Sequence, residues 1–244
     1  ALFRTFCVPR ISALLDRTGE FRQRAQKRYD DTDIIVSELI EHGYDSKRGA
    51  EALERMNEIH GRFAIDNDDL LYVLSTFIFE PIRWNQRYGW RVMSAQERLG
   101  LFHFWRHVGQ RMQIQNIPAD YDTFEAFNRD FEQQHFRFAE SNQQTGAATR
   151  ELFVSWFPRP FAPLVRSAIY AMLDPSLREA FGFPLAAWPM RRLVPAALRL
   201  RGRLVRFCPP RKRPRLRTEQ THPTYRQGYT LEQIGPPMSG EETP

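Results

Sequence analysis

One histidine of this chain stands where it could bind a metal-centred cofactor. His60 follows Ala50, Leu53 and Met56 at steps of three or four residues, which places it on the apolar face of a predicted helix. A neutral imidazole facing an apolar cavity is a common axial ligand of haem iron. Gly61 would let a flat ligand approach the backbone closely. The residues alone leave a second interpretation open, a hydrogen-bonded core histidine, which is the commoner role of an inward-facing histidine.

A polar set precedes this histidine on another predicted helix. Arg28, Asp31 and Thr32 are spaced i, i+3 and i+4, so they share one helix face. Ile35 and Leu39 continue the same face, so the polar set borders an apolar stripe. The spacing fits a partly buried polar site, and it fits equally an Arg–Asp pair at a helix edge that contributes little stability.

The other five histidines offer weaker candidates. His103 and His107 are four residues apart and could share a metal ion, but no third ligand stands at a matching spacing. His135 adjoins a run of phenylalanines and is the main rival of His60, whereas His42 and His222 are expected at a helix end and in a loop. The chain has no HExxH, GxSxG or P-loop motif, so hydrolase and nucleotide-binding functions are unsupported.

Apolar spacing and stop signals predict an all-α fold. We expect a single-domain bundle of about eight helices over residues 1–208, followed by a Pro/Arg-rich tail over residues 209–244. The tail is expected to be extended around the domain or partly disordered. Asn67 and the Ser94–Glu97 capping box mark two helix starts, and Pro81 should end or kink its helix. The expected helices cover residues 19–42, 46–60, 67–81, 94–112, 122–138, 144–156, 163–173, 175–181 and 189–207.

Composition fits one globular domain. The 244 residues are 42% hydrophobic and 26% charged, enough to bury one core. Two cysteines predict no disulfide framework and favour a reducing compartment.

The longest apolar stretch, residues 70–79, is about half the length that a membrane span needs. We therefore expect a cytoplasmic or peripherally membrane-associated protein with no transmembrane segment in the given chain, and we leave an upstream anchor open.

Positive charge is concentrated near the carboxyl-terminal end. The stretch from Met190 to Arg217 contains 11 Lys and Arg residues and no acid, within a net charge of +6. Its predicted helix has an apolar side made of Leu193, Ala197, Leu200 and Leu204. Such a stretch is either a solvated helix face and tail or a peripheral contact with anionic lipid head groups. We expect no nucleic-acid partner.

Seven sequence blocks resemble those of one known family. They are KRYDDT at 27–32, RMNEIH at 55–60, NDDLLY at 67–72, EPIR at 80–83, YGWR at 88–91, SAQER at 94–98 and HPTYRQGY at 222–229. Together they resemble the DUF2236 family, which includes latex clearing protein, a rubber oxygenase, and the ER-bound oxygenase of mycophenolic acid synthesis. The resemblance spans nearly the whole chain and is stronger to the second protein.

The resemblance implies a globin-related all-α fold, a haem b cofactor with its iron, and O₂-dependent cleavage of carbon–carbon double bonds in isoprenoid chains. The family's proximal histidine maps onto His60, with Asn57 one turn before it. The distal Arg, Lys and Thr of latex clearing protein map onto Arg28, Asp31 and Thr32, so Asp31 replaces the lysine. We therefore expect Asp31 to pair with Arg28 or to act as a base.

The expected function is a haem b-dependent oxygenase that acts on O₂ and an apolar small molecule. Arg28 and Thr32 would stabilise bound oxygen, and Asp31 would orient Arg28 or take an allylic proton. Arg83 and Arg91 are candidate partners of the haem propionates, or ordinary salt-bridge residues. Other functions stay open: a non-enzymatic haem- or lipid-binding protein at a membrane surface, a metal enzyme using His103 and His107, and a purely structural helical domain.

Overall fold

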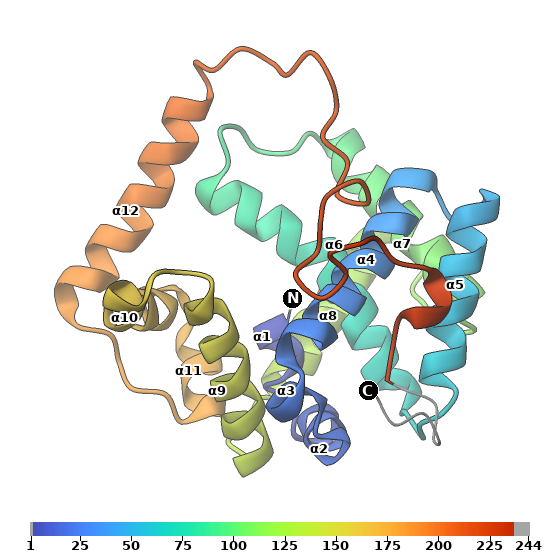
Figure 1. The fold of residues 1–244 in the computed structure, drawn as a ribbon, viewed down its shortest axis with the longest axis horizontal. Helices are drawn as coiled ribbons and strands as arrows, with labels where there is room; N and C mark the ends of the chain where they lie inside the picture. Colours follow the sequence, from blue (N-terminus) through green and yellow to red (C-terminus); the bar gives the residue numbers. More distant parts are fainter. Residues whose placement is uncertain (1, 237–244) are drawn as a thin grey trace.

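The chain folds into helices joined by short loops. The computed structural model describes residues 2–236, which contain twelve α-helices, two short 3₁₀ helices and no strand, so the all-α prediction is confirmed (Figure 1). The α-helices are α1 (Leu2–Thr5), α2 (Pro9–Thr18), α3 (Glu20–Gln23), α4 (Ala25–His42), α5 (Lys47–His60), α6 (Asn67–Tyr88), α7 (Ala95–Arg111), α8 (Tyr121–His135), α9 (Glu140–Ser155), α10 (Ala162–Met172), α11 (Pro175–Phe181) and α12 (Trp188–Val205), and the 3₁₀ helices are η1 (Arg159–Phe161) and η2 (Leu231–Gln233).

The main core lies between five of the longer helices, α4 to α8. Helix α4 packs against α5, and α6 packs against α7 and α8 (Figure 1). Their apolar faces meet in one cluster that includes Ile34, Leu39, Leu71, Ile78 and Phe102. A second cluster joins α1 and α3 to α11. The main cluster fixes the positions of α4, α5 and α6, the helices that carry most of the candidate site.

Polar side chains cap the starts of four helices, α5 to α8. Ser46 accepts a hydrogen bond from the Gly49 amide at 3.0 Å, and Ser94 and Glu97 form the predicted capping box. Asp66, rather than the predicted Asn67, caps α6. In each case a side-chain oxygen satisfies an amide that the helix itself leaves free.

Two expected helix boundaries are wrong. Pro81 does not end its helix, because α6 continues through it to Tyr88, held on two sides by α7 and α8. The helix expected over residues 19–42 is broken at Arg24, whose φ of −138° and ψ of 46° separate α3 from α4. Helices α1 and α2 lie before the first expected helix.

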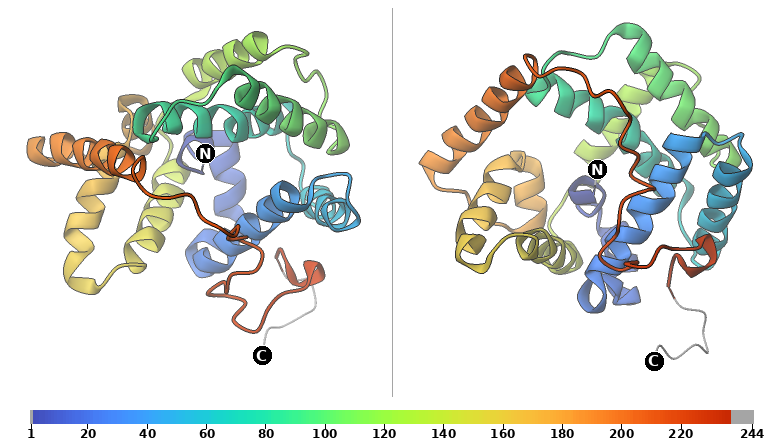
Figure 2. Two further views of the ribbon diagram at one scale, coloured as in Figure 1. Left: turned by 90° about the horizontal axis from the view of Figure 1, so that it is seen from above. Right: turned by 45° about the horizontal axis from the view of Figure 1, so that its top comes forward.

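The carboxyl-terminal tail folds back across α4 and α5 (Figures 1 and 2). Its backbone and side chains bind carboxylates along α4: the Thr224 amide donates to Asp30 at 2.9 Å, and Arg217 Nε donates to Asp33 at 2.6 Å. Ile234 is fully buried in the main core. The part of the tail within residues 209–236 therefore wraps the helical domain.

We expect Ile234→Ala to lower the free energy of unfolding by about 2–5 kcal/mol, because it removes a buried aliphatic side chain. Chemical denaturation measures the change, and Gln227→Ala, at an exposed tail position, serves as the matched control. Equal stability of the two variants would show that the tail does not contribute to the core.

Candidate functional site

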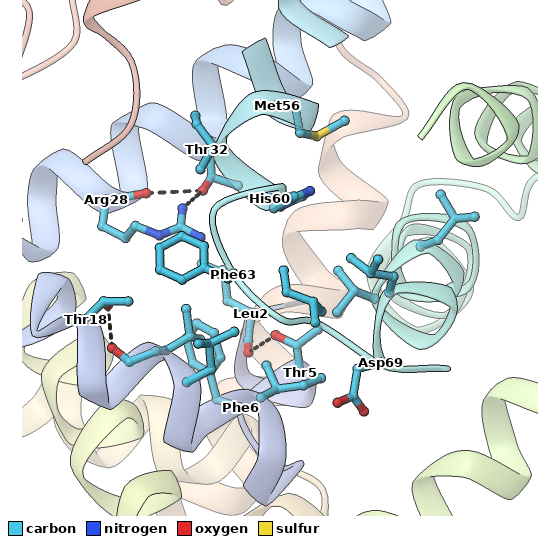
Figure 3. A pocket seen from close by; sticks show the side chains of 18 of the residues that line it. Leu2, Thr5, Phe6, Thr18, Arg28, Thr32, Met56, His60, Phe63 and Asp69 are labelled. Atoms are coloured by element: carbon cyan, nitrogen blue, oxygen red, sulfur yellow. Dashed lines mark hydrogen bonds between the residues drawn. The ribbon is translucent and has the colours of Figure 1, made fainter. Parts of the chain in front are cut away.

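An apolar cavity of about 510 Å³ lies between α2, α4, α5 and α6 (Figure 3). This volume falls within the ordinary range of small-molecule and cofactor sites. Most of its wall is aliphatic or aromatic and includes Ile35, Met56, Ile59, Phe63, Leu70 and Phe77. Gly235 and Pro236 of the tail complete one edge of it.

His60 is the last residue of α5, and its ring borders this cavity (Figure 3). The ring nitrogen Nδ1 is buried and has no hydrogen-bond partner among the described residues. Burial, and to a lesser extent the positive charge of Arg28, together lower the pKa of His60 to about 4. The imidazole is therefore neutral at pH 7, the protonation state in which histidine binds metals.

Arg28 and Thr32 lie beside His60 at the cavity, as the spacing on their helix predicted. The Arg28 guanidinium donates to the Thr32 hydroxyl, which in turn donates to the Arg28 carbonyl at 3.1 Å (Figure 3). Burial lowers the pKa of Arg28, and the charges of Asp31 and Glu20 oppose that shift. Since arginine stays protonated in proteins, the cavity has one desolvated cation and one hydroxyl next to its histidine.

Asp31 also lines the cavity, but it is occupied by other partners. Its carboxylate accepts hydrogen bonds from Lys27 Nζ at 2.9 Å, the Tyr225 hydroxyl at 2.5 Å and the Gly235 amide at 3.1 Å. The expected hydrogen-bonded pairing of Asp31 with Arg28 is therefore wrong, and Asp31 acts on Arg28 only through its charge. Asp31 instead fastens the tail at the cavity edge.

The two arginines considered as propionate partners lie elsewhere. Neither Arg83 nor Arg91 is among the residues that line the cavity. Arg83 donates to Glu80 at 3.0 Å and to Asn128 at 2.8 Å, and Arg91 pairs with Glu97 at 2.6 Å beside the start of α7. The expectation that Arg83 and Arg91 bind haem propionates is therefore wrong. Both arginines form ordinary salt bridges within the fold, which was the alternative interpretation.

Asn57 and the rival histidines also lie outside the cavity lining. Asn57 Nδ2 donates to the Arg111 carbonyl at 3.1 Å and so joins α5 to the end of α7. His135 stacks on a phenylalanine ring and contacts a helix carbonyl. His103 is exposed, and no group of three or more potential metal-binding side chains occurs within residues 2–236. His60 alone of the six histidines borders the cavity.

The sequence interpretation missed one wall of the cavity. Helix α2 contributes Arg10, Ile11 and Leu14, and Arg10 donates to the buried Asp69 of α6 at 2.9 Å. Pro9 at the first turn of α2 is a common helix-start signal that could have revealed this element. Arg10 and Arg17 thus add further positive charge at the cavity.

Comparisons with known proteins identify the family of the chain. Residues 1–207 match the family model described as "ER-bound oxygenase mpaB/B'/Rubber oxygenase, catalytic domain". The chain belongs to this family. Its relatives are named as oxygenases, so the family assignment supports an oxygenase.

Two relatives show the extent of the likeness. The chain is 26% identical over 208 residues to the ER-bound oxygenase mpaB' of Penicillium brevicompactum, covering 77% of this chain and 49% of the relative. It is 27% identical over 198 residues to the ER-bound oxygenase mpaB of Penicillium roqueforti (strain FM164), covering 74% of this chain and 66% of the relative. The chain thus matches half to two thirds of the length of these relatives.

We expect the ring signals of His60 to titrate near pH 4 in a histidine NMR titration, with His60→Gln used to assign them. Because the folded-state pKa lies below the usual 6.5, the unfolded chain binds more protons between these values, and stability falls as the pH drops through this window. The His60→Gln variant should lose less stability between pH 7 and pH 5. A midpoint near 6.5 would contradict the desolvated site.

Proposed function

We propose that the protein is a haem b-dependent oxygenase that cleaves carbon–carbon double bonds of an apolar, isoprenoid substrate. The observation that carries the proposal is the ring of His60: it borders an apolar cavity, its Nδ1 is buried without a partner, and its pKa of about 4 keeps it neutral. The family supports an oxygenase, and the histidine supplies the reason for choosing haem among oxygenase cofactors.

The residues at the cavity fit a haem in three respects. A neutral imidazole can bind its iron, the aliphatic and aromatic wall suits an apolar macrocycle, and three arginines border the space. Arg10 and Arg17 of α2, which also line the cavity, replace Arg83 and Arg91 as candidate partners of its carboxylates, because a carboxylate leaving water requires a positive partner. Haem, when bound, would supply the O₂-activating redox chemistry.

Arg28 and Thr32 would provide the polar part of catalysis. The guanidinium and the hydroxyl are already joined by a hydrogen bond and border the same cavity as His60, so they need little reorganisation to donate to an oxygen atom that gains negative charge. An apolar wall lowers the local dielectric constant, so it would strengthen such hydrogen bonds.

Asp31 has a positioning role in this proposal rather than the proton transfer first considered. Both of its carboxylate oxygens accept hydrogen bonds, Oδ1 from Lys27 and Tyr225 and Oδ2 from Lys27 and Gly235. With both oxygens engaged by donors, the carboxylate is committed to holding the tail in place. It holds Gly235 at the cavity and adds a negative charge next to Arg28.

The substrate class rests on the cavity lining and on the family description. Apolar side chains form most of the wall, which favours a hydrocarbon chain over a polar substrate. The family description contains the words rubber oxygenase, and rubber is a polyisoprenoid. A non-enzymatic haem- or lipid-binding protein is the second candidate, because the same apolar cavity could hold a ligand without turnover.

Haem retention tests the ligand assignment. We expect the protein purified from haem-supplemented cells to show a Soret band, and His60→Ala to lose most of it because the iron loses its protein ligand. His103→Ala, at an exposed position, should retain the band. A normal Soret band in His60→Ala would rule out His60 as the ligand.

Oxygen uptake with a polyunsaturated isoprenoid separates the oxygenase from the binding protein. We expect Arg28→Ala and Thr32→Val to retain haem but to consume O₂ roughly 100-fold more slowly, since each removes a donor to developing charge. Arg91→Ala removes an exposed arginine outside the cavity and should retain full activity. Haem-loaded wild type that consumes no O₂ with such substrates would favour the binding protein.

A further inference from the structure

Helix α12 is held against the rest of the protein by only one of its sides. Val194, Leu198 and Gly202 face inward, where α12 packs on α10 and α6. A Cβ added to Gly202 would lie 2.5 Å from the Tyr88 carbonyl oxygen, so the helix and the end of α6 are in direct backbone contact. This close approach fixes which side of α12 points outward.

The apolar side predicted from the sequence is the side that points away from the protein. We call it the outer stripe; it consists of Leu193, Ala197, Leu200, Leu204 and Phe207. Four of its side chains are largely exposed, Leu193 by 63%, Leu200 by 55%, Leu204 by 58% and Phe207 by 82%. Single exposed leucines are ordinary, but a continuous apolar stripe usually marks an interaction surface.

The charges around the outer stripe are almost all positive and unpaired. Of the 11 basic residues between Met190 and Arg217, Arg217 pairs with Asp33. None of the other ten makes an ion pair with a carboxylate of the described chain. Arg192, Arg199 and Arg203 recur at helical spacing along one edge of the stripe.

The exposed apolar side chains and the unpaired arginines together favour one binding partner for the outer stripe, a membrane surface. A second copy of the chain would bring arginine rows against arginine rows with no acid to separate them, which is unfavourable. An anionic bilayer satisfies both parts of the surface, because leucine and phenylalanine side chains enter the acyl boundary while guanidinium groups bind phosphates. No helix within residues 2–236 is long and apolar enough to cross a membrane, so α12 would lie in the membrane plane.

We propose that α12 is an in-plane docking helix for anionic phospholipid bilayers. The helix lies at one edge of the molecule, apart from α4 and α5, which carry the candidate site (Figures 1 and 2). Docking through the outer stripe therefore leaves the cavity region free of the bilayer contact. The proposal does not depend on haem or on oxygenase activity, because it rests only on the exposure and charge of α12.

Vesicle flotation tests the proposal with the whole protein. We expect binding to phosphatidylcholine vesicles containing 30 mol% phosphatidylserine to be at least tenfold tighter than to pure phosphatidylcholine, and to weaken in 0.5 M NaCl. Leu200→Ser with Leu204→Ser, and separately Arg199→Gln with Arg203→Gln, should each weaken binding at least tenfold. Ile40→Ser and Arg129→Gln alter exposed residues of α4 and α8 and serve as matched controls.

Thermal unfolding and gel filtration without vesicles complete the experiment. The stripe variants should unfold at the wild-type temperature and elute as the wild type does, since they alter only exposed positions. Equal vesicle binding by stripe variants and controls would overturn the proposal. So would a wild-type dimer that the leucine substitutions convert to a monomer, because a second copy would then cover the stripe.

Discussion

The candidate site depends on one unusual constraint: Nδ1 of His60 is buried and has no hydrogen-bond partner among the described residues. A buried polar atom without a partner costs about 1–3 kcal/mol, and a charged imidazole in the same place would cost more. His60 avoids the larger cost by remaining neutral, as its lowered pKa indicates. The remaining cost would be offset by a ligand that occupies the cavity and binds the ring.

Helix α4 positions the groups that surround this ring, and it is restrained on two sides. On one side it packs on α5, which ends at His60. On the other side, the tail binds the carboxylates of Asp30, Asp31 and Glu38. Because Gly235 is held by Asp31 and also lines the cavity, the shape of the site depends on residues about 200 positions away along the chain.

The spacing of residues within one helix predicted which side chains of the site share a helix face. The common face of Arg28 and Thr32, and the inward direction of His60, follow from helical periodicity, and the structure places all three at one cavity. Asp31 has the same spacing, but Tyr225 and Gly235 decide its partners, and helical periodicity contains no information about so distant a segment. For Arg83, by contrast, Glu80 one turn away could have indicated a partner within the fold.

The same limit applies to α12. Periodicity identified its apolar stripe correctly, yet it could not show that the opposite contact, through Gly202 and the end of α6, would leave that stripe exposed. Which face of an amphipathic helix meets the protein is a tertiary property.

Chemical rescue of His60→Gly by free imidazole tests the central claim most directly. The account predicts that this variant, reconstituted with haem, shows an altered absorbance spectrum that returns to the wild-type form in a saturable imidazole titration, because free imidazole replaces the missing side chain in the cavity. A wild-type spectrum in His60→Gly before any imidazole is added would contradict it.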